Sequence, residues 1–205
     1  MKTTDNNPGY FWDVKYSGEE YLYGLQPNRF IAKQLSRLSP GQILLPAEGE
    51  GRNALFAARN GWKVTAYDLS RKGREKALAL AEKAGVTIDY RIAGFIDFDP
   101  GTTLYDVVAL SFVHMPGEMK SAVFGRFISF LKPGGRLIME AFSKNQLSYS
   151  SGGPKDPDLL YSVEEVGWLT GSLIPELLRE ETVLLDEGPG HQGEGAVIRL
   201  VALKA

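Results

Sequence analysis

The stretch Ile43-Leu44-Leu45-Pro46-Ala47-Glu48-Gly49-Glu50-Gly51-Arg52-Asn53-Ala54 decides the fold of this chain. A short apolar run ends in two glycines one residue apart, and a helical segment, Leu55 to Asn60, follows and stops at Gly61. A buried strand, a glycine turn and a helix start are the parts of a nucleotide-binding βα unit. Gly49 and Gly51 have no Cβ, so a ligand can lie against the backbone, and the helix start directs unpaired N–H groups toward it.

A second predicted strand, Lys63 to Tyr67, ends at Asp68. A carboxylate at this place can accept hydrogen bonds from both hydroxyls of a ribose, which favours a nucleotide ligand. Gly49 to Ala54 also fits the pattern G-x-G-x-x-A of dinucleotide enzymes. A glycine turn that binds nothing is the alternative, and Asp68 makes it less favourable.

Composition narrows the class of protein. The 205 residues suit one domain with a substantial core. Lys and Arg number 23 against 25 Asp and Glu, so charge gives no case for a nucleic acid or membrane partner. The chain has no cysteine, and its two histidines are His114 and His191. These counts exclude disulfides, a cysteine nucleophile and a cysteine- or histidine-rich metal site, so we expect no metal.

The polar start of the chain, Met1 to Tyr10, does not resemble a signal peptide. No apolar run approaches the length that spans a bilayer. We therefore expect a cytoplasmic protein whose first residues, Met1 to Gly9, are frayed.

Strands and helices are expected to alternate through the middle of the chain. Strands are predicted at 42–47, 63–67, 87–92, 106–111 and 136–142, and helices at 28–38, 53–60, 71–84 and 117–131. Continuous apolar strands in such an alternation indicate a parallel sheet with helices on both faces. Lys132 to Gly135 is predicted to be a turn.

The end of the chain departs from this alternation. Ser143 to Leu160 is a long polar loop, and the capping box Ser162 to Glu165 opens a predicted helix that continues toward Leu178. Two further strands, 181–186 and 196–203, are joined by a short connection and predict an antiparallel hairpin. The whole chain, 1–205, is predicted to be one domain, with an N-terminal flap and helix (1–40) before the core (42–205).

Aromatic residues crowd the N-terminal part, at Phe11, Trp12, Tyr16, Tyr21 and Tyr23. These rings either cover an exposed end of the core or form a flap over a bound ligand. The sequence favours neither.

Taken together, these elements resemble the class I S-adenosylmethionine (SAM)-dependent methyltransferases, and their order matches nearly the whole chain. Within that family the chain looks like the tellurite-resistance and thiopurine-methyltransferase-like branch. The matching pieces are Tyr23-Gly24-x-x-Pro27-Asn28, Gly49-x-Gly51-Arg52-Asn53, Gly152-Gly153-Pro154-Lys155-Asp156, and Asp186-Glu187-Gly188-x-x-His191-x-Gly193 with Arg199 beyond. The resemblance implies a Rossmann-like α/β fold with a mostly parallel seven-stranded sheet and a C-terminal antiparallel hairpin.

The resemblance also implies a cofactor, SAM, and places residues around it. Those expected to contact the cofactor are Glu48, Gly49, Gly51 and Asn53 at the methionine part, Asp68 at the ribose, Leu69, Phe95 and Ile96 at the adenine, and Ser111 near the methyl group. Phe112 and His114 would border the methyl group as well.

The chain departs from the family pattern at four positions. Leu45 stands where an acid is common, Ala47 where a glycine is common, and Glu48 where a small residue is common. The acid that usually meets the adenine amine falls at Gly94, so backbone, Asp97 or water must meet that amine.

Methyl transfer is an in-line displacement in which alignment and exclusion of water give much of the rate. A soft nucleophile, such as a thiolate or a selenium or tellurium oxyanion, needs little or no base, so a small-molecule acceptor of this kind is expected. The candidate catalytic residues are His114, after the fourth strand, and His191, in the hairpin connection. The alternatives are a polar loop cap for His114 and a solvated hairpin tip for His191. Arg199 is expected to pair with a charge in the sheet, and Glu140 to be structural.

Two other functions fit the glycine turn. One is an NAD(P)-dependent oxidoreductase, which the aromatic lead-in and the terminal hairpin disfavour. The other is a non-enzymatic SAM-binding module, which would have the same fold and is separated only by turnover with an acceptor.

Overall fold

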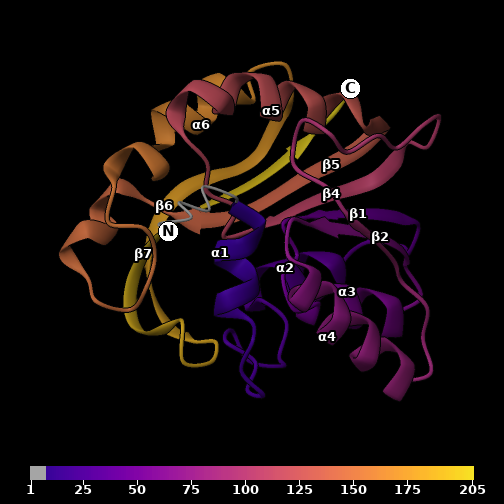
Figure 1. The fold of residues 1–205 in the computed structure, drawn as a ribbon. Helices are drawn as coiled ribbons and strands as arrows, with labels where there is room; N and C mark the ends of the chain where they lie inside the picture. The colour runs from indigo at the N-terminus through magenta and orange to yellow at the C-terminus, as the bar shows by residue number, and fades with distance from the viewer. Residues whose placement is uncertain (1–7) are drawn as a thin grey trace.

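The computed structural model describes residues 8–205 of the chain, and these form one seven-stranded sheet with helices on both faces (Figure 1). In chain order the elements are α1 Pro8–Lys15, α2 Arg29–Leu35, β1 Gln42–Pro46, α3 Arg52–Arg59, β2 Lys63–Asp68, α4 Arg71–Lys83, β3 Asp89–Ile92, β4 Tyr105–Ser111, α5 Gly117–Ser129, β5 Leu131–Phe142, η1 Lys144–Ser148, η2 Pro157–Leu159, α6 Val163–Leu169, β6 Ile174–Asp186 and β7 Gln192–Leu203. The strand order is β3-β2-β1-β4-β5-β7-β6.

Six of the strands run in one direction, and β7 runs against its neighbours β5 and β6. The predicted α/β class, with a mostly parallel sheet and a C-terminal antiparallel hairpin, is confirmed. Because β6 is parallel to β5, the carboxyl ends of β1, β2, β4, β5 and β6 meet at one edge of the sheet. This edge positions the site described below.

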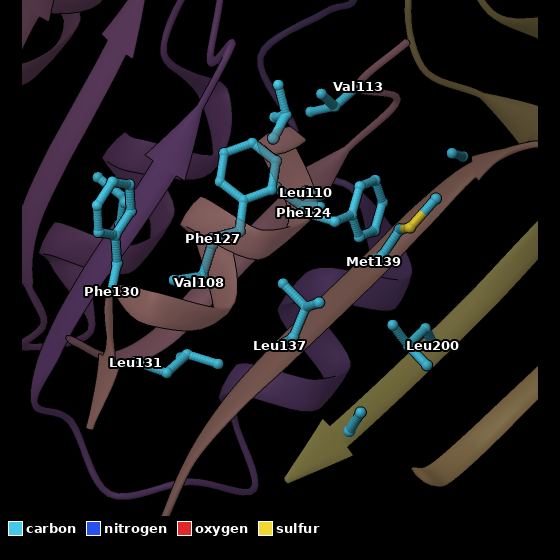
Figure 2. Packing of buried hydrophobic residues seen from close by; sticks show 14 of the residues in the cluster. Val108, Leu110, Val113, Phe124, Phe127, Phe130, Leu131, Leu137, Met139 and Leu200 are labelled. Carbon is cyan, nitrogen blue, oxygen red and sulfur yellow. The ribbon is translucent and has the colours of Figure 1, made fainter. Parts of the chain in front are cut away.

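Two apolar layers hold the helices on the sheet. On one face, α5 and α6 pack on the central strands through a cluster of large side chains (Figure 2), which includes Leu110, Phe124, Phe127, Leu137, Met139, Val166 and Leu200. On the other face, α2, α3 and α4 pack through smaller side chains, among them Ile31, Leu35, Ala54, Ala57, Ala77 and Ala81. The small residues of α3 and α4 bring these helices close to each other and to β1.

Two predictions at the end of the chain need correction. The helix opened by Ser162, whose side chain accepts a hydrogen bond from Glu165 N as a capping box requires, ends at Leu169 rather than near Leu178. Residues 174–178 belong to β6, because Pro175 cannot donate the hydrogen bond that a helix interior needs but is tolerated in an edge strand. The hairpin strands are therefore longer than predicted, and 187–191 connects them.

The predicted turn at 132–135 lies inside β5. Its ladder with β4 jumps from the pair Tyr105 and Leu131 to the pair Val107 and Arg136, and Gly134 has a φ of +78°. The four residues form a bulge in a continuous strand rather than a turn before it.

The N-terminal part contains a helix, α1, that the sequence did not predict. Of the stretch expected to be frayed, residues 1–7 lie outside the described part, while Pro8 and Gly9 begin α1. Figure 1 shows α1 in front of the sheet, and α1 contacts α4. Within residues 8–205, no helix combines the length and the apolar character that crossing a bilayer requires.

We predict that Gly51→Ala destabilises the fold far more than Gly85→Ala. Both glycines have positive φ, +88° and +68°, so both variants carry backbone strain of about 1–2 kcal/mol. Only at Gly51 would the added Cβ also meet the Cβ of Ala77 on α4, well under 3.0 Å away, whereas nothing lies near Gly85. Urea unfolding measures the free energy of unfolding of both variants. Equal losses of stability would contradict close α3–α4 packing at the glycine turn.

Candidate functional site

The predicted cofactor residues gather where β1 and β2 end, on the carboxyl edge of the sheet. Gly49 has a φ of +59° and Gly51 a φ of +88°, and Gly51 is the N-cap of α3 without any side-chain cap. Ala47, where a glycine was expected, also has a positive φ of 49°. The turn thus keeps the left-handed backbone of the family pattern at the cost of some strain.

Two buried carboxylates hold this turn in place. Glu48 accepts hydrogen bonds from Ala54 N (2.7 Å) and Asn53 Nδ2 (3.2 Å), so it supplies the cap that Gly51 lacks. Asp68 accepts from Gly49 N at 3.0 Å through one oxygen and from Ser70 N at 2.8 Å through the other. Glu48 is therefore directed at α3, while Asp68 stands at the end of β2 where a ribose acceptor was predicted.

Burial controls the charge of both groups. It raises the pKa of Glu48 to about 7, against the lowering effect of its hydrogen bonds. Burial also raises the pKa of Asp68, against the hydrogen bonds from Ser70 and Gly49. Glu48 thus titrates near neutral pH in the folded chain.

Tyr16 covers the glycine turn from the N-terminal segment. A Cβ placed on Gly49 would lie 2.7 Å from the Tyr16 hydroxyl, and this ring is buried and stacked on Trp12. Asp13 ties the segment to α4, since it accepts hydrogen bonds from Ser70 Oγ (2.6 Å) and from Lys72 N (2.9 Å). Tyr16 is thus a buried part of the structure that lies over the glycine turn, while a flap over a bound ligand stays a prediction.

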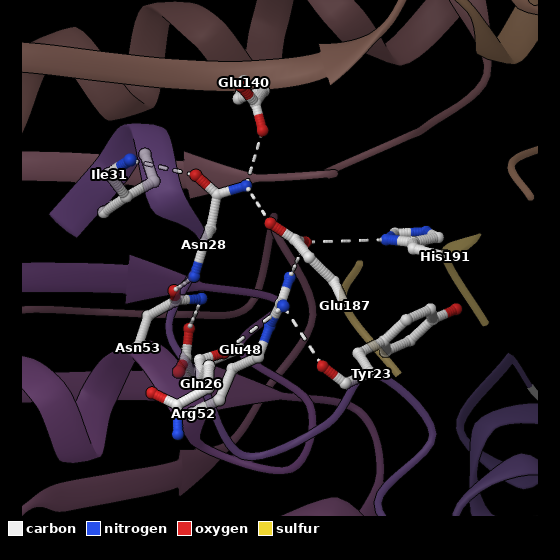
Figure 3. Close-up of polar contacts among 10 residues, drawn as sticks. All are labelled: Tyr23, Gln26, Asn28, Ile31, Glu48, Arg52, Asn53, Glu140, Glu187 and His191. Carbon is white, nitrogen blue, oxygen red and sulfur yellow. Dashed lines mark hydrogen bonds and ion pairs between the residues drawn. The ribbon is translucent and has the colours of Figure 1, made fainter. Parts of the chain in front are cut away.

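A buried polar network joins the glycine turn to the hairpin connection (Figure 3). Arg52, the first residue of α3, forms an ion pair of 2.7 Å with Glu187, and both side chains are buried. Asn28 Nδ2 donates to Glu187 at 3.1 Å and to Glu140 at 2.5 Å, while Asn28 N donates to the side chain of Asn53. Elements far apart in the sequence are therefore fixed to one another at this edge.

Arg199 and Glu140 have the structural roles that the sequence predicted. Arg199 Nε donates to Glu140 at 2.6 Å, its Nη1 donates to Glu181, and its guanidinium lies over the ring of Phe30. Asn28 Nδ2 donates a hydrogen bond to the other carboxylate oxygen of Glu140. Both charged groups are thus engaged within the sheet and α2.

The predicted adenine residues lie across the edge from the glycine turn, where Leu69 and Ile96 are exposed. A Cβ at Gly94 would lie 3.0 Å from Asp97 Oδ2 and 3.6 Å from Leu69 Cδ2. The Asp97 carboxylate therefore occupies the place of the missing side chain. Arg126 donates to the carbonyls of residues 95 and 98 and fixes this loop, beside a hollow of about 490 Å³.

The predicted acceptor-side residues come together where β4 ends and in the connection between β6 and β7. His114 is part-buried, and its Nδ1 lies 2.8 Å from the carbonyl of Leu159. His191 is buried rather than solvated at a hairpin tip, and its ring packs 4.5 Å from Tyr23 and 4.3 Å from Phe112. Burial lowers the pKa of His114 to about 4 and also lowers that of His191. Both rings are therefore neutral near pH 7.

Sequence reasoning missed several residues of this region. Arg52, Asn28 and Glu187 lie within the quoted motifs, but nothing in the sequence indicates that they bond to one another. Tyr16 was named only as one of several aromatic residues. Its position over Gly49 depends on the unpredicted helix α1.

The comparisons with known proteins agree with this geometry. Residues 43–135 match the family model described as a methyltransferase domain. The ubiquinone biosynthesis O-methyltransferase of Bradyrhizobium sp. (strain ORS 278) is 30% identical over 119 residues, which cover 58% of this chain and 47% of that protein. Residues 43–135 of this chain are therefore similar to a methyltransferase domain.

Solved structures share the fold of this chain. The structure of TehB from Haemophilus influenzae superposes with a TM-score of 0.72 at 16% identity, covering 96% of this chain and 67% of that one. The N-methyltransferase NodS from Bradyrhizobium japonicum WM9, in complex with S-adenosyl-L-homocysteine (SAH), gives a TM-score of 0.71 at 13% identity, covering 98% and 100%. The chain spans about half the length of the curated relatives it matches.

The match supports the predicted cofactor, SAM, and the carboxylates at this edge suit its ribose and adenine groups. The missing Cβ atoms of Gly49 and Gly51 make room for Tyr16 and Ala77, and Glu48 takes up the backbone N–H of Ala54 at the start of α3. Asp68 at the end of β2 and Asp97 beside Gly94 stay the predicted partners of the ribose and of the adenine amine.

The raised pKa of Glu48 predicts a pH-dependent stability. In the folded chain the carboxyl group of Glu48 stays protonated up to about pH 7, whereas in the unfolded chain it loses its proton near pH 4.5. Protonation of Glu48 therefore stabilises the fold. This contribution is fully present below pH 4.5 and is lost as pH rises through 7. Relative to Glu48→Gln, the wild type should gain up to about 3 kcal/mol between pH 8 and pH 4.5 in urea unfolding. A constant difference between the two proteins would contradict the raised pKa.

We predict that Asp68→Ala abolishes useful SAM affinity. Two ribose hydroxyls would lose a charged acceptor, at roughly 1.5–3 kcal/mol per bond, so binding should weaken at least about hundredfold. Calorimetric titration with SAM measures this, with Asp89→Ala as control because Asp89 is an exposed carboxylate at the opposite end of the neighbouring strand. A variant that binds SAM as tightly as the wild type would remove Asp68 from the cofactor site.

Proposed function

We propose that this protein transfers a methyl group from SAM to a small-molecule acceptor. The observation that carries the proposal is the meeting of two sets of residues at one edge of the sheet. Asp68 and the glycine turn have the chemistry to hold the cofactor, and His114 and His191 lie beyond β4 and β6, where the transferred group would emerge. The relatives named as O-methyltransferases support the same reaction.

In this proposal each part of the edge has a separate task. SAM supplies an electrophilic methyl group when it is bound. Asp68 orients the ribose, Glu48 holds the start of α3, and Tyr16 excludes water from the turn. Ser111, Phe112 and His114 border the acceptor, and Glu187 fixes the connection that carries His191.

The sequence motifs support the finer assignment to the tellurite-resistance and thiopurine-methyltransferase-like branch, and the likeness to TehB is consistent with it. That branch would favour a soft acceptor, a thiol or a selenium or tellurium oxyanion. The names of the curated relatives instead favour an oxygen acceptor.

The test is methyl transfer from SAM labelled in its methyl group. The purified protein is incubated separately with tellurite, thiophenol and catechol, and labelled product and SAH are quantified. The proposal is supported if any acceptor yields labelled methylated product in the same molar amount as SAH. Tight SAM binding without transfer to any acceptor would favour the non-enzymatic module.

We predict that His191→Ala lowers turnover at least about tenfold and leaves SAM affinity unchanged. His191 lies on the acceptor side. Its ring packs on Tyr23 and Phe112 and not on the glycine turn. Trp168→Ala, which removes an exposed ring on α6, is the control and should change neither quantity. Equal losses of turnover and SAM binding, or loss of neither, would count against a substrate-side role.

A further inference from the structure

Three polar atoms at the acceptor end of the edge have no hydrogen-bond partner within the described residues. They are Ser111 Oγ, His114 Nε2 and His191 Nδ1, and all are sealed from solvent. Phe142 lies between the two histidines, with ring centroids 5.9 Å from His114 and 5.1 Å from His191. Buried polar atoms are rarely left unpaired in folded proteins, so a molecule bound here could supply hydrogen-bond partners to all three.

The hydrogen bond of His114 decides what kind of partner it needs. Its Nδ1 lies 2.8 Å from the carbonyl oxygen of Leu159, which can only accept, so Nδ1 carries the hydrogen. Burial lowers the pKa of His114 to about 4 and keeps the ring neutral. Nε2 therefore has a free lone pair, and its partner must be a hydrogen-bond donor.

Charges around the two histidines disfavour an anionic partner. The cations that act on them are Lys120 and Arg52, and each is paired with a carboxylate: Lys120 with Glu165 at 3.0 Å, and Arg52 with Glu187 at 2.7 Å. The Glu187 carboxylate also lies 3.8 Å from His191 Nδ1. An oxyanion would lose its hydration here without gaining an unpaired cation.

The walls of this region are flat rings. Phe112 and Phe142 pack 4.6 Å apart, and Tyr161 lies 5.7 Å from His114. Tyr23 covers His191 from the N-terminal segment, and Leu22 O accepts a hydrogen bond from Gly190 N. An aromatic ring of an acceptor could stack against these side chains.

We infer that the methyl acceptor is an uncharged phenol-type hydroxyl on an aromatic ring, and that this hydroxyl donates its hydrogen to His114 Nε2. The inference rests on the proposed function and replaces the soft acceptor that the sequence favoured. On transfer, an oxygen lone pair forms the C–O bond, the C–S bond breaks with its electron pair left on sulfur, and the hydroxyl proton passes to Nε2. A weak base is sufficient, because the hydroxyl becomes strongly acidic as the C–O bond forms.

Binding of catechol and 1,2-dimethoxybenzene to the SAH complex tests this inference. The two molecules have the same ring, but only catechol has hydrogen-bond donors. Catechol should bind the wild type at least tenfold more tightly, and His114→Phe should remove most of that difference. In ¹⁵N spectra, catechol but not 1,2-dimethoxybenzene should shift the Nε2 resonance of His114. Trp168→Phe, on an exposed ring of α6, should leave both affinities unchanged.

Equal affinity of the two molecules for the wild type would overturn the inference, and this comparison needs no variant to fold. An unshifted Nε2 resonance with catechol bound would also overturn it. Methylation of tellurite or thiophenol in a protein that does not prefer catechol would overturn the inference while supporting the proposed methyl transfer. Absence of SAH binding would instead count against the proposed function itself.

Discussion

The ion pair between Arg52 and Glu187 joins residues 135 positions apart and is the contact on which the site depends. Arg52 begins α3 directly after the glycine turn, and Glu187 begins the connection that carries His191. A buried ion pair recovers its desolvation cost only when both partners are fully hydrogen-bonded. Here Arg52 also donates to the carbonyl of Tyr23, and Glu187 accepts from Asn28. The pair therefore contributes more to the position of the two loops than to net stability.

The same network brings the N-terminal segment over the edge. Asp13 bonds to the start of α4, Leu22 N donates to Glu50 at 2.8 Å, and Tyr23 bonds to Arg52 through its carbonyl. The segment thus contacts both the cofactor turn and the acceptor-side loop. These contacts hold the segment over the edge, where Tyr23 packs on the ring of His191.

Much of the fold could be predicted because its signals are local. The glycine turn, Asp68 after β2 and the alternation of apolar strands with helices are each visible within a few residues of sequence. Even the positive φ of Ala47 follows from its place in that pattern. The prediction that the helix continues to Leu178 was wrong, because the capping box at Ser162 indicates where the helix begins and not where it ends. Pro175 lies in β6.

The polar site was less predictable, since its contacts are long-range. The sequence predicts a cofactor contact for Glu48, which stays a prediction, but it does not indicate that the Glu48 carboxylate caps α3. Burial among Phe142, Tyr161 and Leu159 lowers the pKa of His114, and no local pattern encodes that burial. The charges that disfavour an oxyanion become visible only when Lys120 and Arg52 are seen paired with Glu165 and Glu187.

The most direct test of the account is a calorimetric titration of the purified protein with SAM, SAH, NAD and NADP. The account predicts micromolar binding of SAM and SAH and no binding of the two dinucleotides. Binding of NAD or NADP without SAM or SAH would mean that the glycine turn and Asp68 hold a different nucleotide, and would contradict the assignment of this edge to methyl transfer.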